Sequence, residues 1–446
     1  MALVCLLASA LLPPPAPARP TPSTPTHLPR STAESFRPPA PTRARLPPPR
    51  SRAIRASLPP THDEWMLYAL RLAERGRLTT APNPWVGCVI IGADGSTVLG
   101  EGWHVVKGGP HAEAAALADA RERGVPREQM EGGTAYVTLE PCHAGVGKTT
   151  PPCDEALVAS GLRRVHIALV DPDPTFGNAG VGHLREHGVD VTVGTAAAAV
   201  AASLRPYLHH RRTRLPYVVL KAAPSADGAI ACADGSSQWI TGGGARAHAQ
   251  LLRASSRAIL VGSGTALADE PRLTLRLDDA PVPPEWHTPA VGPLRVVLDG
   301  RGRVVSGPLL DPTLAPTLIF TTAAAPASSR RVWEAAGVEV CEVGAGPHGE
   351  GVSLEQVLVE LGGRGVLQLM VEGGGALLGC FLAQRVAQQM RLYIGACVLG
   401  SDARRWIQAP IASSIEEAQR WKLLDVQRLG DDVCLDYLLP GGNFDP

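Results

Sequence analysis

The chain of 446 residues lacks several features that would place it in other protein classes. It has no excess of basic residues, because 42 Lys and Arg are balanced by 42 Asp and Glu. Its nine cysteines have no tight, regular spacing, which excludes a secreted disulfide framework and favours a reducing compartment. The leading apolar run, residues 3–12, is too short to span a bilayer, and we expect no membrane partner. The length predicts two domains and an appendage.

Acidic residues are almost absent from residues 1–56, which contain eight Arg but only Glu34 among many Pro, Ser, Thr and Ala. Such a segment cannot bury enough apolar surface to fold, so we expect a disordered transit peptide and a mature protein in the plastid stroma. A short secretory stretch at residues 3–12 leaves open a two-part plastid address. Removing the segment leaves 34 basic and 41 acidic residues. Nucleic-acid binding needs a basic face, so no nucleic-acid partner is expected.

A broken metal-binding pattern is the most informative part of the chain. It comprises His111-Ala-Glu113, Pro141-Cys142 and Pro151-Pro-Cys153. One imidazole and two thiolates can bind one Zn²⁺ and leave its fourth position open for water. Glu113 is not a ligand in this set and can transfer protons. A lone His-x-Glu more often lies on a surface helix, and a pair of Cys can be two buried thiols, but the combination matches the signature of zinc nucleobase deaminases.

The spacing of the two cysteines departs from that signature, because ten residues, 143–152, separate them. Gly145, Gly147 and Lys148 in this insert form a basic, glycine-bearing loop that could hold a phosphate. Asn83 lies between two prolines, and its amide could therefore face a ligand from a rigid turn. The alternative for Asn83 is an ordinary turn residue.

Residues 60–195 are predicted to form an α/β/α domain. A capping box, Thr61-x-x-Glu64, starts an amphipathic helix that ends near Gly76. Further helices are expected from His111, from Cys153 and over 180–187, and strands over 86–91, 134–139, 165–170 and 189–193. The three ligands then come from two helix N-termini and one strand end.

Residues 196–215 are predicted to be a linker, helical at first and then solvated. His209 and His210 could be metal ligands, but no Cys or carboxylate stands near them in sequence. Residues 216–442 form a second α/β domain, with strands over 217–223, 258–261, 294–298 and 367–371 and helices over 245–254 and 376–381. Glycine turns at 262–265, 300–302 and 373–375 suit a dinucleotide's phosphates. Without G-x-G-x-x-G that signal is weak, and tight turns are the usual explanation.

The motifs of the first domain resemble the deaminase half of the bifunctional riboflavin-biosynthesis deaminase/reductase family, in its plastid-targeted plant or algal form. The resemblance rests on Asn83, His111-Ala-Glu113, Thr138-Leu-Glu-Pro-Cys142, Lys148, Thr150-Pro-Pro-Cys153 and Asp171-Pro-Asp-Pro174. It implies a cytidine-deaminase-like fold, and substrate contacts from Asn83 and Lys148.

The second domain is similar to the reductase half of the same family, whose fold is like that of dihydrofolate reductase. The matching stretches are Lys221-x-x-x-Ser225-x-Asp227-Gly228, Gly235-x-Ser237-x-Trp239-Ile-Thr241, Leu267-Ala-Asp269-x-Pro271-x-Leu273-Thr-x-Arg276, Val371-Glu-Gly-Gly374 and Leu399-Gly-Ser-Asp-Ala403. Two positions depart from the family pattern, Ala229 and Cys397, where relatives commonly carry basic residues.

The reductase resemblance implies which residues contact NADPH and which contact substrate. The implied NADPH contacts are Ala223, Trp239, Thr265, Asp269, Gly300, Gly374, Gly375, Ala376, Leu377, Leu378, Gly379 and Cys380. The implied substrate contacts are Lys221, Ser237, Arg253, Leu273, Arg276 and Glu372, the two Arg being suited to a phosphate.

The expected function is therefore a two-step enzyme that acts on a pyrimidine ribosyl phosphate. Zinc-dependent deamination of 2,5-diamino-6-(5-phosphoribosylamino)pyrimidin-4-one would be followed by NADPH-dependent reduction of the ribosyl group. One alternative is that only one half, most plausibly the deaminase, is active while the other is a scaffold. A second is a nucleoside or nucleic-acid deaminase fused to an unrelated reductase. A homo-oligomer is compatible with the sequence.

A protein that starts at Ser57 tests the interpretation of residues 1–56. We predict that it folds and keeps both activities, because the Arg-rich, Pro-rich segment is an address and not part of either domain. Deaminase and reductase assays on the shortened and full-length chains check this. Loss of folding on truncation would contradict it.

Overall fold

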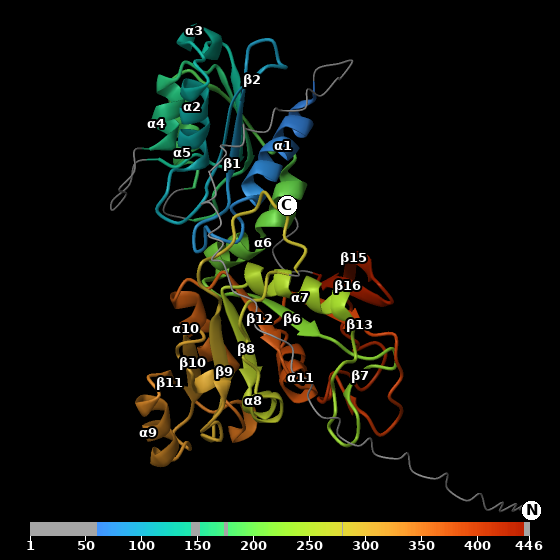
Figure 1. Cartoon of the computed structure of the whole chain (residues 1–446). Coiled ribbons are helices and arrows are strands. Elements are labelled where there is room, and N and C mark those ends of the chain that lie inside the picture. Colours follow the sequence, from blue (N-terminus) through green and yellow to red (C-terminus); the bar gives the residue numbers. More distant parts are fainter. Residues whose placement is uncertain (1–59, 144–151, 174–176, 279, 441–446) are drawn as a thin grey trace, which may run out of the picture. The chain divides into compact units, whose positions relative to one another are not determined.

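The computed structural model describes residues 60–143, 152–173, 177–278 and 280–440 (Figure 1). Within these ranges the chain forms two α/β domains, each built on its own sheet. The expected transit peptide, residues 1–56, lies outside the described residues, as do Gly145, Gly147 and Lys148.

The first sheet has five strands in the order β2-β1-β3-β4-β5. The strands are β1 (Gly87–Ile91), β2 (Val98–Trp103), β3 (Thr134–Leu139), β4 (Arg164–Leu169) and β5 (Asp190–Val193). β1 runs antiparallel to both β2 and β3, whereas β3, β4 and β5 are parallel. β1 and β2 form a hairpin whose connection contains Ala93-Asp94-Gly95.

Helices cover both faces of this sheet (Figure 1). They are α1 (His62–Glu74), α2 (Ala112–Glu122), α3 (Arg127–Met130), α4 (Cys153–Ala159), α5 (Ala179–Glu186) and α6 (Ala197–Thr213). The alternating side chains of β1 show why: Val89 packs with α1 and α6, while Ile90 packs with α2, α4 and α5. The α/β/α layering is confirmed, and α1 begins with the predicted capping box of Thr61 and Glu64.

The segment after the first domain differs from the expected solvated linker. Its helix, α6, continues to Thr213 instead of ending near Leu204. His209 and His210 are only 5% exposed, and His210 Nε2 lies 3.0 Å from the Gly362 carbonyl oxygen. The prediction of a solvated run was wrong for these two histidines, because burial of a polar run depends on packing against residues far away in the chain, such as Gly362.

The second sheet has nine strands in the order β11-β10-β9-β8-β12-β6-β13-β16-β15. They are β6 (Tyr217–Ala222), β8 (Ala258–Gly262), β9 (Leu294–Leu298), β10 (Thr317–Thr321), β11 (Glu339–Glu342), β12 (Gln368–Glu372), β13 (Gln389–Ile394), β15 (Lys422–Leu429) and β16 (Asp432–Leu438). All neighbours are parallel except those that involve β16. Continuous apolar runs such as β8 Ala-Ile-Leu-Val fit strands buried on both faces.

Helices again cover both faces of the second sheet. They are α7 (Gly243–Ser255), α8 (Ser263–Asp269), α9 (Ala327–Ala335), α10 (Leu354–Gly363) and α11 (Gly375–Ala383). Leu260 packs with α10 and α11, whereas its neighbour Ile259 packs with α7, α8 and α9. Smaller elements are β7 (Ala229–Ala231), which pairs with β14 (Arg404–Arg405), and the 3₁₀ turns Pro308–Leu310 and Pro347–Gly349.

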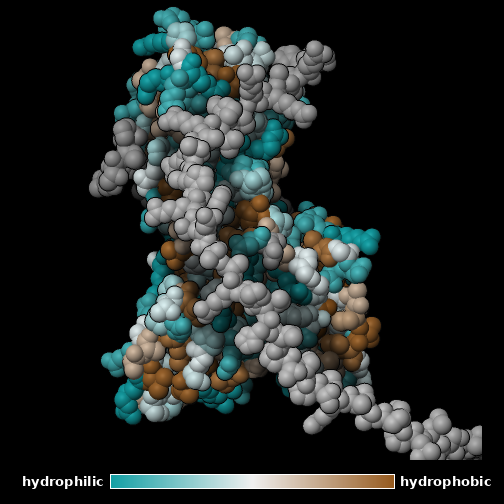
Figure 2. All heavy atoms as spheres, viewed as in Figure 1, coloured by the Kyte–Doolittle hydropathy of each residue, from teal (hydrophilic) through white to brown (hydrophobic). Residues whose placement is uncertain are grey.

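The surface that Figure 2 shows carries hydrophobic residues in separate small areas among hydrophilic ones. The described part of the chain has no helix that combines the length and the apolar character needed to cross a membrane.

A fully buried arginine holds the connections beside β9. Arg295 is 0% exposed, and its guanidinium donates hydrogen bonds of 2.6–2.8 Å to the carbonyl oxygens of Pro308, Asp311 and Ala315. Those carbonyls lie in segments without regular strand pairing. The arginine therefore supplies the hydrogen bonds that a neighbouring strand would otherwise donate to them.

Replacing Arg295 with Met should leave these buried carbonyls without a donor. We predict that Arg295→Met lowers the free energy of unfolding by about 3 kcal/mol. The exposed Arg331 offers a matched control, and Arg331→Met should change stability by about 0.5 kcal/mol at most. Urea unfolding of both variants measures the difference, and equal stabilities would contradict the role given to Arg295.

Candidate active sites

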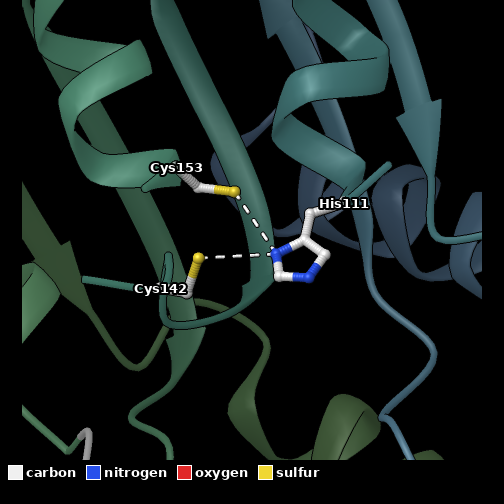
Figure 3. A group of neighbouring side chains, drawn as sticks. All are labelled: His111, Cys142 and Cys153. Carbon is white, nitrogen blue, oxygen red and sulfur yellow. Dashed lines mark hydrogen bonds between the residues drawn. The ribbon is translucent and has the colours of Figure 1, made fainter. Parts of the chain in front are cut away.

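Three sulfur and nitrogen ligands converge at one end of the first sheet (Figure 3). His111 is the N-cap residue of α2, Cys142 follows β3, and Cys153 is the first residue of α4. His111 Nδ1 lies 3.4 Å from Cys142 Sγ and 3.5 Å from Cys153 Sγ. Segments separated by up to 42 positions thus present their donor atoms to one point.

The donor set fits a zinc ion. The ligand atoms of His111, Cys142 and Cys153 all lie within 4.8 Å of one another, and two sulfurs with one nitrogen form a three-ligand set of the catalytic type. Hydrogen bonds from Cys153 and then from His111 stabilise the thiolate of Cys142 and lower its pKa, while the pKa of Cys153, which keeps its proton in this pair, is raised. A thiolate is the form that binds metal.

Glu113 lies beside this centre but is a separate group. Its side chain is 3% exposed, and burial raises the pKa of its carboxyl to about 7, with the Cys142 charge adding to the rise. A carboxyl group that titrates near neutrality can both accept and return a proton. The geometry therefore supports the predicted role of Glu113 as a proton carrier.

Glu140 is a positioning residue whose role the sequence did not reveal. Its buried carboxylate accepts hydrogen bonds from the backbone N–H groups of Asp171, Asn178 and Val181 at 3.0–3.2 Å. Gly180 allows α5 to approach this closely, because a Cβ there would lie 2.1 Å from the Pro141 carbonyl oxygen. The end of β3, and with it Cys142, is thereby fixed to the start of α5.

His104 is a second residue that sequence analysis missed. It is 3% exposed, its Nδ1 lies 2.9 Å from the Pro110 carbonyl oxygen, and its Nε2 lies 3.3 Å from Asn83 Nδ2. The carbonyl requires a proton on Nδ1, so Nε2 accepts from the Asn83 amide. The ring also packs edge-on against His111 at 5.4 Å. Asn83 is thus connected through His104 to His111 of the metal centre, and its contact with a ligand stays a prediction.

The second domain places a group of buried charges at the carboxyl ends of neighbouring strands. Glu372 ends β12 and is paired in register with Lys221 of β6. Arg253 of α7 binds Glu372 with two hydrogen bonds of 2.8 and 2.9 Å. Burial opposes the charge on Glu372, but Arg253 and Lys221 outweigh it and hold the Glu372 pKa at about 2.

The predicted substrate residues around this group differ in their surroundings. Arg253 already neutralises Glu372, whereas Arg276 is exposed. Leu273 is buried, with a left-handed φ of 52°, so its backbone is the part that can face a ligand. Ser237 is half-buried. The structure brings Lys221, Arg253 and Glu372 together, and the substrate contacts of all six residues stay predictions.

The predicted NADPH residues follow three adjacent parallel strands. Gly300 follows β9, Thr265 follows β8 and Gly374 follows β12, in the sheet order β9-β8-β12. Thr265 Oγ1 accepts a hydrogen bond from the Gly374 N–H at 3.1 Å. Ligands of open α/β sheets bind outside the carboxyl ends of the strands, which is where these residues meet.

The stretch Gly374 to Cys380 mixes two kinds of position. A Cβ at Gly375 would lie 2.4 Å from the Arg405 carbonyl oxygen, so packing within the chain already requires that glycine. A Cβ at Gly374 would come no closer than 3.8 Å to any other residue. Leu378 is 0% exposed in the core, while Ala376 and Cys380 are exposed. Gly374 and Ala376 are thus better placed for a cofactor than Gly375 or the Leu378 side chain.

Trp239 lines a cavity of about 470 Å³ that also includes Cys397. The indole is 68% exposed, and the Arg246 guanidinium lies 4.3 Å above its ring. Cys397, which departs from the family pattern, therefore shares a pocket with a predicted cofactor contact. Asp269 ends α8 and is exposed, and Ala223 follows β6.

Family models cover both domains. Residues 59–169 match the cytidine and deoxycytidylate deaminase zinc-binding region, and residues 216–435 match the RibD C-terminal domain. Both predicted domain types are confirmed by these matches.

Curated relatives match along nearly their whole length. The riboflavin biosynthesis protein RibD of Chlamydia pneumoniae is 38% identical over 86% of this chain and 96% of the relative. The RibD protein of Escherichia coli is 38% identical over 83% of this chain and 97% of the relative.

Solved structures agree with the sequence relatives. Acinetobacter baumannii RibD is 35% identical, with a TM-score of 0.72, and the match covers 84% of this chain and 98% of that one. A diaminohydroxyphosphoribosylaminopyrimidine deaminase/5-amino-6-(5-phosphoribosylamino)uracil reductase from Thermotoga maritima is 30% identical, with a TM-score of 0.71. The match covers 85% of this chain and 98% of that one.

The Arg253–Glu372 pair predicts a specific pH dependence of stability. A carboxyl whose pKa falls on folding stabilises the protein above its unfolded value, 4.5 here, and that stability is lost as the pH falls towards about 2. Glu372→Gln removes this titration, so the stability advantage of the wild type should shrink below pH 4.5, by about 3 kcal/mol in all.

Urea unfolding, measured from pH 7 down to the lowest pH at which the proteins still fold, gives the stability difference between the wild type and Glu372→Gln. Glu334→Gln is a matched control because Glu334 is exposed, and its difference from the wild type should stay constant. A difference for Glu372→Gln that does not change with pH would show that the pair does not hold the carboxyl ionised.

Proposed function

The chain belongs to the RibD family of bifunctional riboflavin-biosynthesis enzymes, and from this premise we propose how its residues carry out the two reactions. The enzyme deaminates 2,5-diamino-6-(5-phosphoribosylamino)pyrimidin-4(3H)-one hydrolytically. It then reduces the ribosyl group of the product with NADPH, which gives 5-amino-6-(5-phosphoribitylamino)uracil. The observation that carries this proposal is the convergence of His111, Cys142 and Cys153 beside the buried carboxyl of Glu113.

In the first step His111, Cys142 and Cys153 would hold one Zn²⁺ per chain. When bound, zinc supplies the positive charge that makes a water molecule acidic near neutral pH. Glu113 accepts a proton from that water as it adds to the ring carbon that bears the amine, and returns a proton to the departing ammonia. Asn83, whose amide contacts His104, would bind the pyrimidine.

In the second step the residues at the carboxyl ends of β9, β8 and β12 would hold NADPH, which supplies a hydride to C1′ of the sugar. Backbone N–H groups around Gly374 and Ala376, at the start of α11, suit the cofactor's phosphates. Lys221 and Glu372 are neighbouring charged residues at the ends of β6 and β12. The exposed Arg276 suits the substrate phosphate.

Two alternatives are weaker than this proposal. A nucleoside deaminase fused to an unrelated reductase does not explain a match to RibD proteins over both halves. A scaffold in place of an active reductase does not explain why Glu372, Arg253 and Lys221 keep a buried, fully ionic arrangement. Such an arrangement costs desolvation energy and is weak evidence of a purely structural role.

The plastid location rests on composition alone, and we propose it as a separate statement. Residues 1–56 combine eight Arg with one acidic residue, and the deaminase-family match begins only at residue 59. Fusing residues 1–56 to a fluorescent protein in an algal or plant cell tests this. Plastid fluorescence is expected, and a cytosolic signal would contradict the address.

Glu113→Gln should separate the two activities. The amide has the size of the carboxyl but cannot carry the proton, so deamination should fall by about 10²–10⁴-fold. Zinc content should not change, because Glu113 is not a ligand. Reduction of supplied deaminated intermediate by NADPH should continue at the wild-type rate. Loss of that reduction in a folded, zinc-loaded protein would contradict two separate sites.

Asp269→Ala is the reciprocal test in the second domain. It should deaminate normally and accumulate the deaminated intermediate, because Asp269 is predicted to help bind NADPH. Product analysis with and without NADPH checks this, and the expected change is a higher KM for NADPH. Equal loss of both activities would point instead to misfolding or to a shared site.

A further inference from the structure

A second group of metal-ligating side chains lies in the first domain, formed by residues that the deamination chemistry does not use. The ligand atoms of His143, Asp154 and His183 all lie within 4.8 Å of one another. His143 Nδ1 is 2.6 Å from Asp154 Oδ2, and the Asp154 side chain is 0% exposed. We propose that these three residues form a second divalent-metal site, distinct from the centre at His111.

The placement of the three residues follows from the elements already described. His143 directly follows Cys142, Asp154 directly follows Cys153, and His183 lies in the middle of α5. Gly180, one turn before His183, packs against the Pro141 carbonyl. The contact that positions Cys142 therefore also brings α5 to His143, and the second group is built by the same backbone arrangement as the first.

His187 extends the group along α5. It stands four positions after His183, and the two imidazole centroids are 4.2 Å apart. Its Nδ1 lies 2.8 Å from the His183 carbonyl oxygen, so Nδ1 carries the proton and Nε2 keeps its lone pair. Histidines at i and i+4 face the same side of a helix and are a frequent metal-binding pair. His187 is not among the residues whose ligand atoms lie within 4.8 Å of one another, so the proposed site has three protein ligands, and water completes the coordination.

The donor atoms select the class of metal. Two imidazoles and one carboxylate suit Zn²⁺ and its neighbours Co²⁺ and Ni²⁺, whereas Mg²⁺ and Ca²⁺ prefer oxygen ligands. The first centre differs because it contains two thiolates. A metal at the second site would connect the residue after Cys142, the residue after Cys153 and α5. Its binding would therefore stabilise the region that carries the catalytic ligands.

Cobalt titration of the full chain after metal removal distinguishes the two sites. Co²⁺ bound by thiolates gives a charge-transfer absorption, and Co²⁺ bound by imidazole and carboxylate does not. We expect one equivalent with that absorption and a second without it, and a higher melting temperature at two equivalents than at one. Cys153→Ser should remove the absorption, which tests the first centre separately.

Two histidine variants decide whether the second equivalent belongs to this group. His183→Gln should weaken the second equivalent by at least about tenfold while keeping the thiolate absorption and deamination within a few-fold. His287→Gln, which removes an exposed histidine of the second domain, should bind both equivalents as the wild type does. His143→Asn removes another ligand of the same group and should also weaken the second equivalent.

The proposal fails if the wild type binds one equivalent only, which would make His143–Asp154 a simple hydrogen-bonded pair. It also fails if His183→Gln and His143→Asn keep the second equivalent at wild-type affinity. Failure of the first equivalent alone would count against the deaminase centre and not against the second site.

Discussion

A single buried carboxylate sets the geometry on which the first active site depends. Glu140 accepts hydrogen bonds from three backbone N–H groups, two in the segment between β4 and α5 and one in the first turn of α5. The end of β3 is thereby fixed against α5, with only a glycine hydrogen between Gly180 and the Pro141 carbonyl. Cys142 follows at once, and the start of α4 brings Cys153 to it. His111 completes the set from the start of α2.

The second active site depends on charge and not on metal. Parallel strands β12 and β6 end side by side, so Glu372 and Lys221 are neighbours, and Arg253 reaches them from α7. Glu372 offsets the cost of burying Arg253 and Lys221, whose like charges repel each other, so removing the carboxylate would leave two cations unpaired. The same strand ends carry the glycine turns predicted for NADPH. One fold principle, ligands at the carboxyl ends of parallel strands, thus organises the whole reductase surface.

The sequence predicted four strands of each large sheet, half of the sixteen strands found in the described residues, together with the α/β/α layers and the converging ligand residues, because hydrophobic periodicity and ligand spacing are local signals. It did not reveal the support for that site. Glu140 and His104 act through partners 31–41 and 6–21 positions away. Glu140 lies in the Thr138–Cys142 motif, but local sequence does not show which backbone groups its carboxylate binds. His209 and His210 were misjudged because burial of a polar run depends on what packs over it. The pairing of Arg253 with Glu372, 119 positions apart, was equally invisible.

The central claim is that one chain performs deamination and then reduction. Its most direct test is to incubate the metal-loaded protein with the diaminopyrimidine ribosyl phosphate, with and without NADPH, and to identify the products by mass spectrometry. The account predicts the deaminated 5-amino-6-(5-phosphoribosylamino)uracil without NADPH, and the ribitylamino product when NADPH is present. Deamination in both reactions with no NADPH oxidation would contradict it and leave the second domain a scaffold.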